Sequence, residues 1–133
     1  MPAGGVYTLS KEERICSKKL IDKLFGGGKS SSVASFPLRA VYMTAERADG
    51  EPQAQILVSV PKRHFKRAVK RNRVKRQVRE AYRLNKQILI DSLKDRQDTK
   101  VAVAFIWLDN SLHTTEKVGR SVVSLLRRIS ETL

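Results

Sequence analysis

The sequence predicts an α+β fold, a two-layer α/β sandwich in which helices pack on a four-stranded, mostly antiparallel sheet. The chain has 133 residues, the usual size of one domain, and 41% of them are hydrophobic, enough for one packed core. Short segments rich in β-branched and aromatic residues alternate with segments whose apolar residues recur at helical spacing. These segments follow one another in the order α-β-β-β-α-β-α.

The N-terminal part of the chain is expected to contain an arm and one short helix. Residues 1–16 include few apolar positions, so we expect a loosely ordered arm there and a single α/β domain, which carries the binding surface described below, over residues 17–133. Ser17 is a suitable N-cap for the helix, and the glycines at 26–28 end it. The apolar residues that share one face of this helix are Leu20, Ile21, Leu24 and Phe25.

Two segments, 36–44 and 55–60, are rich in β-branched and aromatic residues and flank a polar turn. We expect them to pair as an antiparallel hairpin. Pro61 closes the second strand, because proline cannot donate a hydrogen bond to a neighbouring strand. The serine-rich stretch 29–35 fits either a loop or a weak edge strand, and the sequence leaves both open.

The C-terminal third is expected to supply a central strand and a closing helix. Residues 100–108, KVAVAFIWL, form a nearly continuous apolar run, which is typical of a strand covered on both faces. Thr114 and Thr115 are candidate N-caps for the helix that follows. The apolar residues at helical spacing in this helix are Val118, Val122, Leu125, Leu126 and Ile129.

The chain is strongly basic. It has 27 Lys and Arg residues against 13 Asp and Glu residues, a formal net charge of +14 and a pI near 10.4. Ten basic residues and no acidic residue lie from position 62 to position 79, whereas the rest of the chain carries 17 basic and 13 acidic residues. Like charges at helical spacing repel one another, so we expect an external polyanion to compensate them.

Nucleic acid is favoured over a membrane as this polyanion. No run approaches the roughly 18 apolar residues of a spanning helix, and the N-terminal segment lacks the apolar core of a signal peptide. We therefore expect a cytoplasmic protein without a membrane partner. Cys16 is the only cysteine, and His64 and His113 are isolated, so the sequence predicts neither a metal site nor a catalytic group on the protein.

The basic segment separates into two faces when it is placed on a helix at 100° per residue. The face expected to meet the core carries Val74, Val78, Ala81, Tyr82, Asn85 and Leu89. The opposite face, which we call the basic ridge, carries Asn72, Arg76, Arg79 and Arg83, flanked by Lys75 and Lys86. Guanidinium groups thus recur about once per turn, and a guanidinium can hold a phosphate with two hydrogen bonds.

Residues 66–83, KRAVKRNRVKRQVREAYR, resemble the signature of the ribonuclease P protein component family. The centre of the resemblance is the triplet Arg71, Asn72 and Arg73. It extends to the strand end at Ser59 and Val60 before a basic pair, and to the end of the first helix before a Gly-Lys-Ser sequence. The resemblance covers roughly residues 9–130. Where the family often has an aromatic residue one turn before Phe25, this chain has Ile21.

The resemblance implies a role in tRNA maturation. In this family an RNA subunit, with Mg²⁺ bound mainly by that RNA and its substrate, removes the 5′ leader of precursor tRNA. The protein supports this reaction as one monomer per catalytic RNA, without a catalytic residue or metal ligand of its own. The residues that would bind the catalytic RNA are Arg71, Asn72, Arg73, Lys75, Arg76, Arg79 and Arg83. Those that would lie near the leader are Phe25, Lys62 and Arg63.

The handedness of one chain connection and an alternative function complete the expectations from the sequence. The family resemblance implies a left-handed crossover between the strand before the basic helix and the strand after it, although the general rule would predict a right-handed one. The alternative function is that of a ribosomal or other structural RNA-binding protein, which would share the basic face without serving a nuclease.

Overall fold

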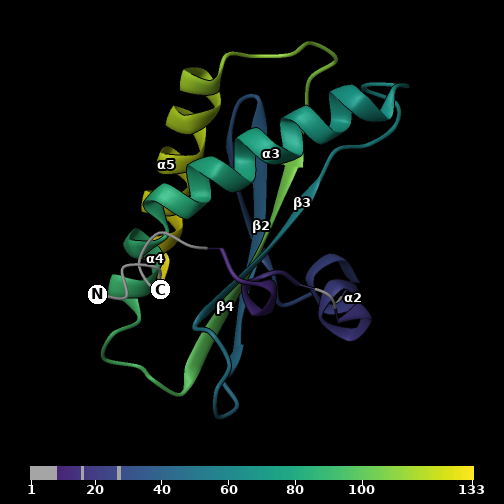
Figure 1. Cartoon of the computed structure of the whole chain (residues 1–133). Helices are drawn as coiled ribbons and strands as arrows, with labels where there is room; N and C mark the ends of the chain where they lie inside the picture. Colours follow the sequence, from purple (N-terminus) through teal and green to yellow (C-terminus); the bar gives the residue numbers. More distant parts are fainter. Residues whose placement is uncertain (1–8, 16, 27) are drawn as a thin grey trace.

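The structure is a computed structural model that describes residues 9–15, 17–26 and 28–133. One sheet with the strand order β1-β2-β4-β3 forms its centre, and helices lie on both faces of this sheet (Figure 1). The strands are β1 (Ser31–Ser35), β2 (Leu38–Glu46), β3 (Ala54–Ser59) and β4 (Thr99–Trp107). The helices are the short 3-10 helix η1 (Lys11–Glu13), α2 (Lys18–Gly26), α3 (Ala68–Asn85), α4 (Gln87–Ser92) and α5 (Thr115–Thr132). These elements confirm the predicted α+β class.

The central strand is β4, as its apolar sequence predicted. It pairs antiparallel with β2 and parallel with β3. The predicted hairpin between segments 36–44 and 55–60 is therefore wrong, because β4 lies between these two strands. When the apolar β4 is buried, its backbone groups need hydrogen-bonding strands on both of its edges. This requirement outweighs the closeness of β2 and β3 in the sequence. The stretch 29–35 contains the edge strand β1, which pairs with β2 across a tight turn at residues 36–37.

The parallel strands β3 and β4 are joined through α3 and α4 in a β-α-β crossover. In Figure 1, α3 lies in front of the sheet, and the upper end of β4 lies to the left of the upper end of β3. The crossover is therefore left-handed, as the family resemblance implied and contrary to the general preference.

Two apolar clusters hold the helices on the sheet. Helices α3, α4 and α5 pack on one face, where Val74, Val78 and Tyr82 of α3 are fully buried. The apolar residues that were expected to face the core from α5 are all buried as well. Helix α2 lies on the opposite face and contributes Leu24 to a smaller cluster. The side chain of Thr114 accepts a backbone hydrogen bond in the first turn of α5 and so caps this helix, as predicted.

Part of the expected N-terminal arm is attached to the domain. Ile15 is buried, and its amide donates a hydrogen bond of 2.8 Å to a carbonyl oxygen of β3. The Glu13 carboxylate lies 2.8 Å from the ammonium of Lys86, whose side chain is only 4% exposed. The sequence placed Lys86 beside the basic ridge, but α3 ends one residue earlier and Lys86 turns inward to Glu13. Residues 1–8 and Cys16 of the arm lie outside the described residues.

Candidate nucleic-acid interface

Helix α3 carries the predicted interface, and its orientation agrees with the sequence pattern. Val74 and Val78 are fully buried against the sheet. Asn72, Arg73 and Arg76 are exposed on the other side of the helix. A helix buried on one side leaves its long cationic side chains in water, where they can reach a ligand without giving up core packing.

Three further predicted residues of α3, Lys75, Arg79 and Arg83, are half-buried. Arg83 donates from Nε to Oε2 of Glu80 at 3.0 Å. This interaction lowers the pKa of the Glu80 carboxyl and raises the pKa of Arg83. Partial burial, and then repulsion from Arg14, lowers the pKa of Arg79. An anion beside Arg79 would relieve this repulsion, because it favours the charged form of the guanidinium.

Arg14 is a basic residue near the ridge that the sequence analysis did not single out. Together with Leu9 it lines a hollow beside Arg76 and Arg79. Its backbone is bridged to Ile56 of β3, which holds this segment close to α3. The sequence gives no signal that Arg14 lies near Arg79, because the two residues are far apart in the chain. They come close only because the segment of Arg14 is attached to β3.

The two arginines of the Arg-Asn-Arg triplet have different surroundings. Arg71 Nη1 donates to the carbonyl oxygen of Phe65 at 2.7 Å and to that of Lys66 at 2.9 Å. Both carbonyls belong to the loop before α3, and the Arg71 side chain is half-buried there. Arg73, in contrast, is exposed. The triplet therefore combines one arginine held by the protein with one that is open to solvent.

The loop between β3 and α3 presents Lys62 and Arg63, which are both exposed. Phe65 anchors this loop, because its ring is buried in the main core. His64 ties the loop to the segment after β4, since its Nδ1 lies 2.7 Å from Oδ1 of Asn110. The two cations that the resemblance placed near the leader thus project from a loop with fixed attachments.

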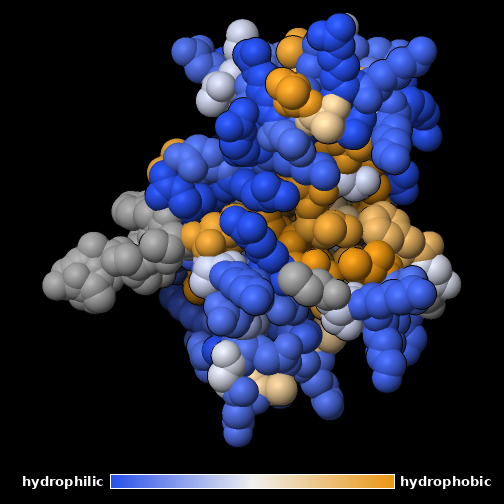
Figure 2. Space-filling view, turned by 45° about the vertical axis from the view of Figure 1, so that its right-hand side comes forward, coloured by the Kyte–Doolittle hydropathy of each residue, from blue (hydrophilic) through white to orange (hydrophobic). Residues whose placement is uncertain are grey.

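Phe25, the third residue placed near the leader, ends the apolar face of α2 and is 51% exposed. It lies on the sheet face opposite α3, where Leu57 and Ile106 are half-buried. Figure 2 shows apolar side chains across the middle of one side of the molecule, between strongly hydrophilic regions above and below. Because Phe25 is on α2 while Lys62 and Arg63 follow β3, a ligand in contact with all three would have to cross the sheet surface.

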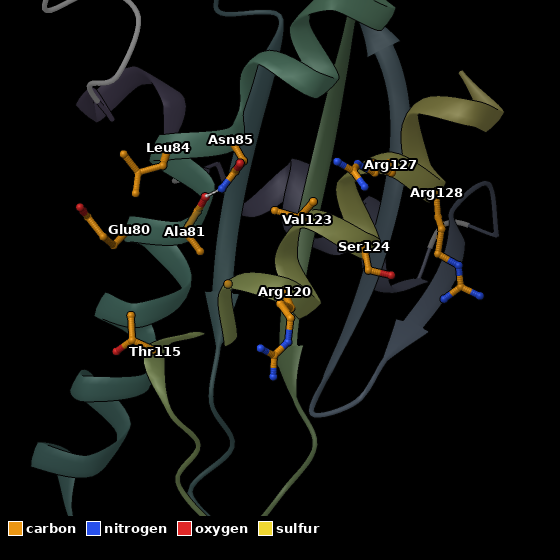
Figure 3. A pocket seen from close by; sticks show the side chains of 11 residues that line it. Glu80, Ala81, Leu84, Asn85, Thr115, Arg120, Val123, Ser124, Arg127 and Arg128 are labelled. Atoms are coloured by element: carbon orange, nitrogen blue, oxygen red, sulfur yellow. Dashed lines mark hydrogen bonds between the residues drawn. The ribbon is translucent and has the colours of Figure 1, made fainter. Parts of the chain in front are cut away.

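A groove between α3 and α5 adjoins the basic ridge (Figure 3). Leu84 of α3, which is 50% exposed, and Val123 of α5 contribute apolar surface to this groove. Arg120, Arg127 and Arg128 line it from α5. These arginines extend the positive surface beyond α3. The sequence analysis did not anticipate them, because they lie outside the basic segment of residues 62–79.

Asp109 and His113 form a local pair after β4. Oδ2 of Asp109 lies 2.6 Å from Nε2 of His113, and this hydrogen bond lowers the pKa of the Asp109 carboxyl. The His113 ring also packs edge-on against Trp107. Within residues 9–15, 17–26 and 28–133, no three His, Cys, Asp or Glu side chains gather in a group that could hold a metal ion. None of the described helices is both long and apolar enough to cross a membrane.

A small α+β protein with a cationic surface of this kind on one helix belongs to the class of nucleic-acid-binding proteins. Comparisons with known proteins narrow this class. The family model described as Ribonuclease P matches residues 9–129. The chain is 44% identical to a ribonuclease P protein component of Porphyromonas gingivalis, over 98% of this chain and 92% of that protein. It is 30% identical to the corresponding protein of Chlorobium phaeobacteroides, over 93% of this chain and 89% of that one.

Solved structures have the same fold. The ribonuclease P protein of Staphylococcus aureus superimposes with a TM-score of 0.66 at 20% identity, covering 88% of this chain and 94% of that chain. The ribonuclease P protein of Thermotoga maritima superimposes with a TM-score of 0.64 at 19% identity, covering 87% of this chain and 96% of that chain. The chain therefore belongs to the ribonuclease P protein component family. Proteins of this family are part of a ribonucleoprotein, the ribonuclease P holoenzyme, and their role is the maturation of the 5′ end of tRNA.

Proposed function

We propose that this chain binds the catalytic RNA of ribonuclease P and the 5′ leader of precursor tRNA, and so assists Mg²⁺-dependent removal of the leader. In this proposal the RNA subunit carries the chemistry, and the protein binds and orients. The observation that carries the proposal is the exposed side of α3, where Asn72, Arg73 and Arg76 lie opposite the buried Val74 and Val78.

The surface for the catalytic RNA consists of the residues of the basic ridge and their neighbours. These residues are Arg71, Asn72, Arg73, Lys75, Arg76, Arg79 and Arg83. Exposed guanidinium groups one helical turn apart are spaced by roughly 5 Å along the axis, so each can reach a different phosphate. Contacts of this kind release condensed counterions and favour binding at low salt.

The surface for the leader consists of Phe25, Lys62 and Arg63. An exposed aromatic ring can stack on an unpaired base, and the stacking does not require a particular base. The two cations of the loop after β3 can contact the leader backbone. The exposure of all three side chains supports this assignment, because none of them is needed to fill the core.

Magnesium in this proposal is bound mainly by the RNA subunit and the precursor. The protein contributes cations that are covalently fixed to a folded scaffold. These cations neutralise phosphates where two polyanions meet, so less Mg²⁺ is needed to bring enzyme RNA and substrate RNA together. One protein molecule per catalytic RNA is sufficient for this role.

Reconstitution tests the proposal. The chain is added to a bacterial ribonuclease P RNA at low Mg²⁺, and cleavage of a precursor tRNA is followed. We expect stimulation by the wild-type chain and loss of stimulation in the double variant Arg73→Ala/Arg76→Ala. Lys94→Ala, which removes an exposed cation from the segment between α4 and β4, should give full stimulation. Absence of any stimulation would favour a structural RNA-binding protein instead.

A further inference from the structure

We infer that Arg71 is a positioning residue that fixes the loop of residues 61–67 against the start of α3, and that its main role is not a phosphate contact. The inference rests on the proposed function, because the fixed loop is useful only if Lys62 and Arg63 bind RNA. It assigns different tasks to Arg71 and Arg73, the two arginines of the triplet.

Hydrogen bonds join the Arg71 side chain to the loop before α3. One guanidinium nitrogen, Nη1, donates to two consecutive carbonyl oxygens, those of Phe65 at 2.7 Å and Lys66 at 2.9 Å. The Phe65 ring is buried in the main core and fixes one side of this backbone. Arg71 therefore joins the first turns of α3 to a loop segment that is already anchored at one point.

The start of α3 is an unfavourable place for an uncompensated cation. Arg67, at the N-cap, makes no side-chain capping hydrogen bond, and the first turn contains no acidic residue. The positive end of the helix dipole disfavours a cation near the N-terminus. Carbonyl oxygens of Phe65 and Lys66 compensate Arg71 there, because a charged donor forms strong hydrogen bonds with them.

Helix geometry separates Arg71 from the exposed residues of the triplet. Residues two positions apart on a helix point about 200° apart around its axis. Arg71 therefore shares its side of α3 with Val74 and Val78, at i+3 and i+7, and these two residues are buried. Arg73 lies on the exposed side with Arg76. A single RNA strand that follows the exposed side would meet Arg73 and pass away from Arg71.

Three variants of the full chain test the inference: Arg71→Gln, Arg71→Lys and the matched control Arg73→Gln. Amide hydrogen exchange in the free protein reports on the loop. We expect exchange of the His64 amide, which donates to the Pro61 carbonyl oxygen within this loop, to accelerate by about tenfold in both Arg71 variants. The side chains of Gln and Lys are shorter than that of Arg and do not reach both carbonyl oxygens. Exchange in Arg73→Gln should match the wild type.

Affinity for the catalytic RNA is then measured as a function of salt. We expect Arg71→Gln and Arg71→Lys to bind more weakly with an unchanged slope of log affinity against log salt. The control Arg73→Gln should flatten this slope by about one unit. A flattened slope in Arg71→Gln that Arg71→Lys restores, with normal exchange in the loop, would overturn the inference. Unchanged RNA affinity in all three variants, despite fast exchange in the loop, would instead overturn the proposed function.

Discussion

Replacement of Arg76 by alanine tests the basic ridge most directly. Arg76 is exposed on the side of α3 opposite the buried Val78. Each phosphate contact contributes roughly 0.7 to 0.9 to the slope of log affinity against log salt, so the slope should become less steep by about that amount. When salt rises from about 0.05 to 0.2 M, the affinity of the variant should therefore fall by a factor roughly threefold smaller than that of the wild type.

The assay is a titration of catalytic RNA at several salt concentrations, with Val78→Ala as the matched control. Val78 is fully buried, so its truncation should lower the free energy of unfolding by roughly 1–3 kcal/mol, as measured by denaturant unfolding. The folded fraction of Val78→Ala should keep the wild-type salt slope. Arg76→Ala should show the opposite result, an altered slope with nearly unchanged stability.

One result would refute this reasoning. If Arg76→Ala kept the wild-type slope while Val78→Ala flattened it, the side of α3 that binds RNA would be the one assigned to the core. A flattened slope accompanied by a large loss of stability in Arg76→Ala would also contradict the argument, because an exposed side chain should not be needed for folding.

Three other predictions address the leader, the N-terminal attachment and the division of labour. Phe25→Ala should weaken binding of a leader-bearing precursor by roughly 1–3 kcal/mol but leave mature tRNA binding and Tm unchanged, whereas a large drop in Tm would assign Phe25 to the core. Glu13→Gln should lower the free energy of unfolding by roughly 1–3 kcal/mol, since the largely buried Lys86 loses its carboxylate, while the exposed Glu12→Gln should not. Purified chain without RNA should not cleave a precursor in the presence of Mg²⁺, and cleavage at the mature 5′ end would place chemistry on the protein.

Local periodicity was enough to predict α2, α3, α5 and the central strand, but it did not predict that α3 ends at Asn85 and that Leu89 lies on a separate helix, α4. The apolar positions of α3 and α5 recur at 3.6-residue spacing, and this spacing fixes which side chains face the sheet. The cluster of ten basic residues and the Arg-Asn-Arg triplet predicted an RNA ligand. Both are local features that can be recognised in the sequence, because each is contained in one short segment. The sequence by itself therefore determined most of the long elements, the buried side of α3 and the class of ligand.

Only the tertiary structure decided how distant segments meet. The sheet order places β4 between β2 and β3, Glu13 turns Lys86 inward, and Arg14 lies beside Arg79. Each of these depends on competition among many burial and pairing possibilities between segments far apart in the chain, which a local pattern cannot rank. The attachment of Arg71 to its own loop belongs to the same group, because a side chain's partner is set by folded geometry and not by its place in a motif.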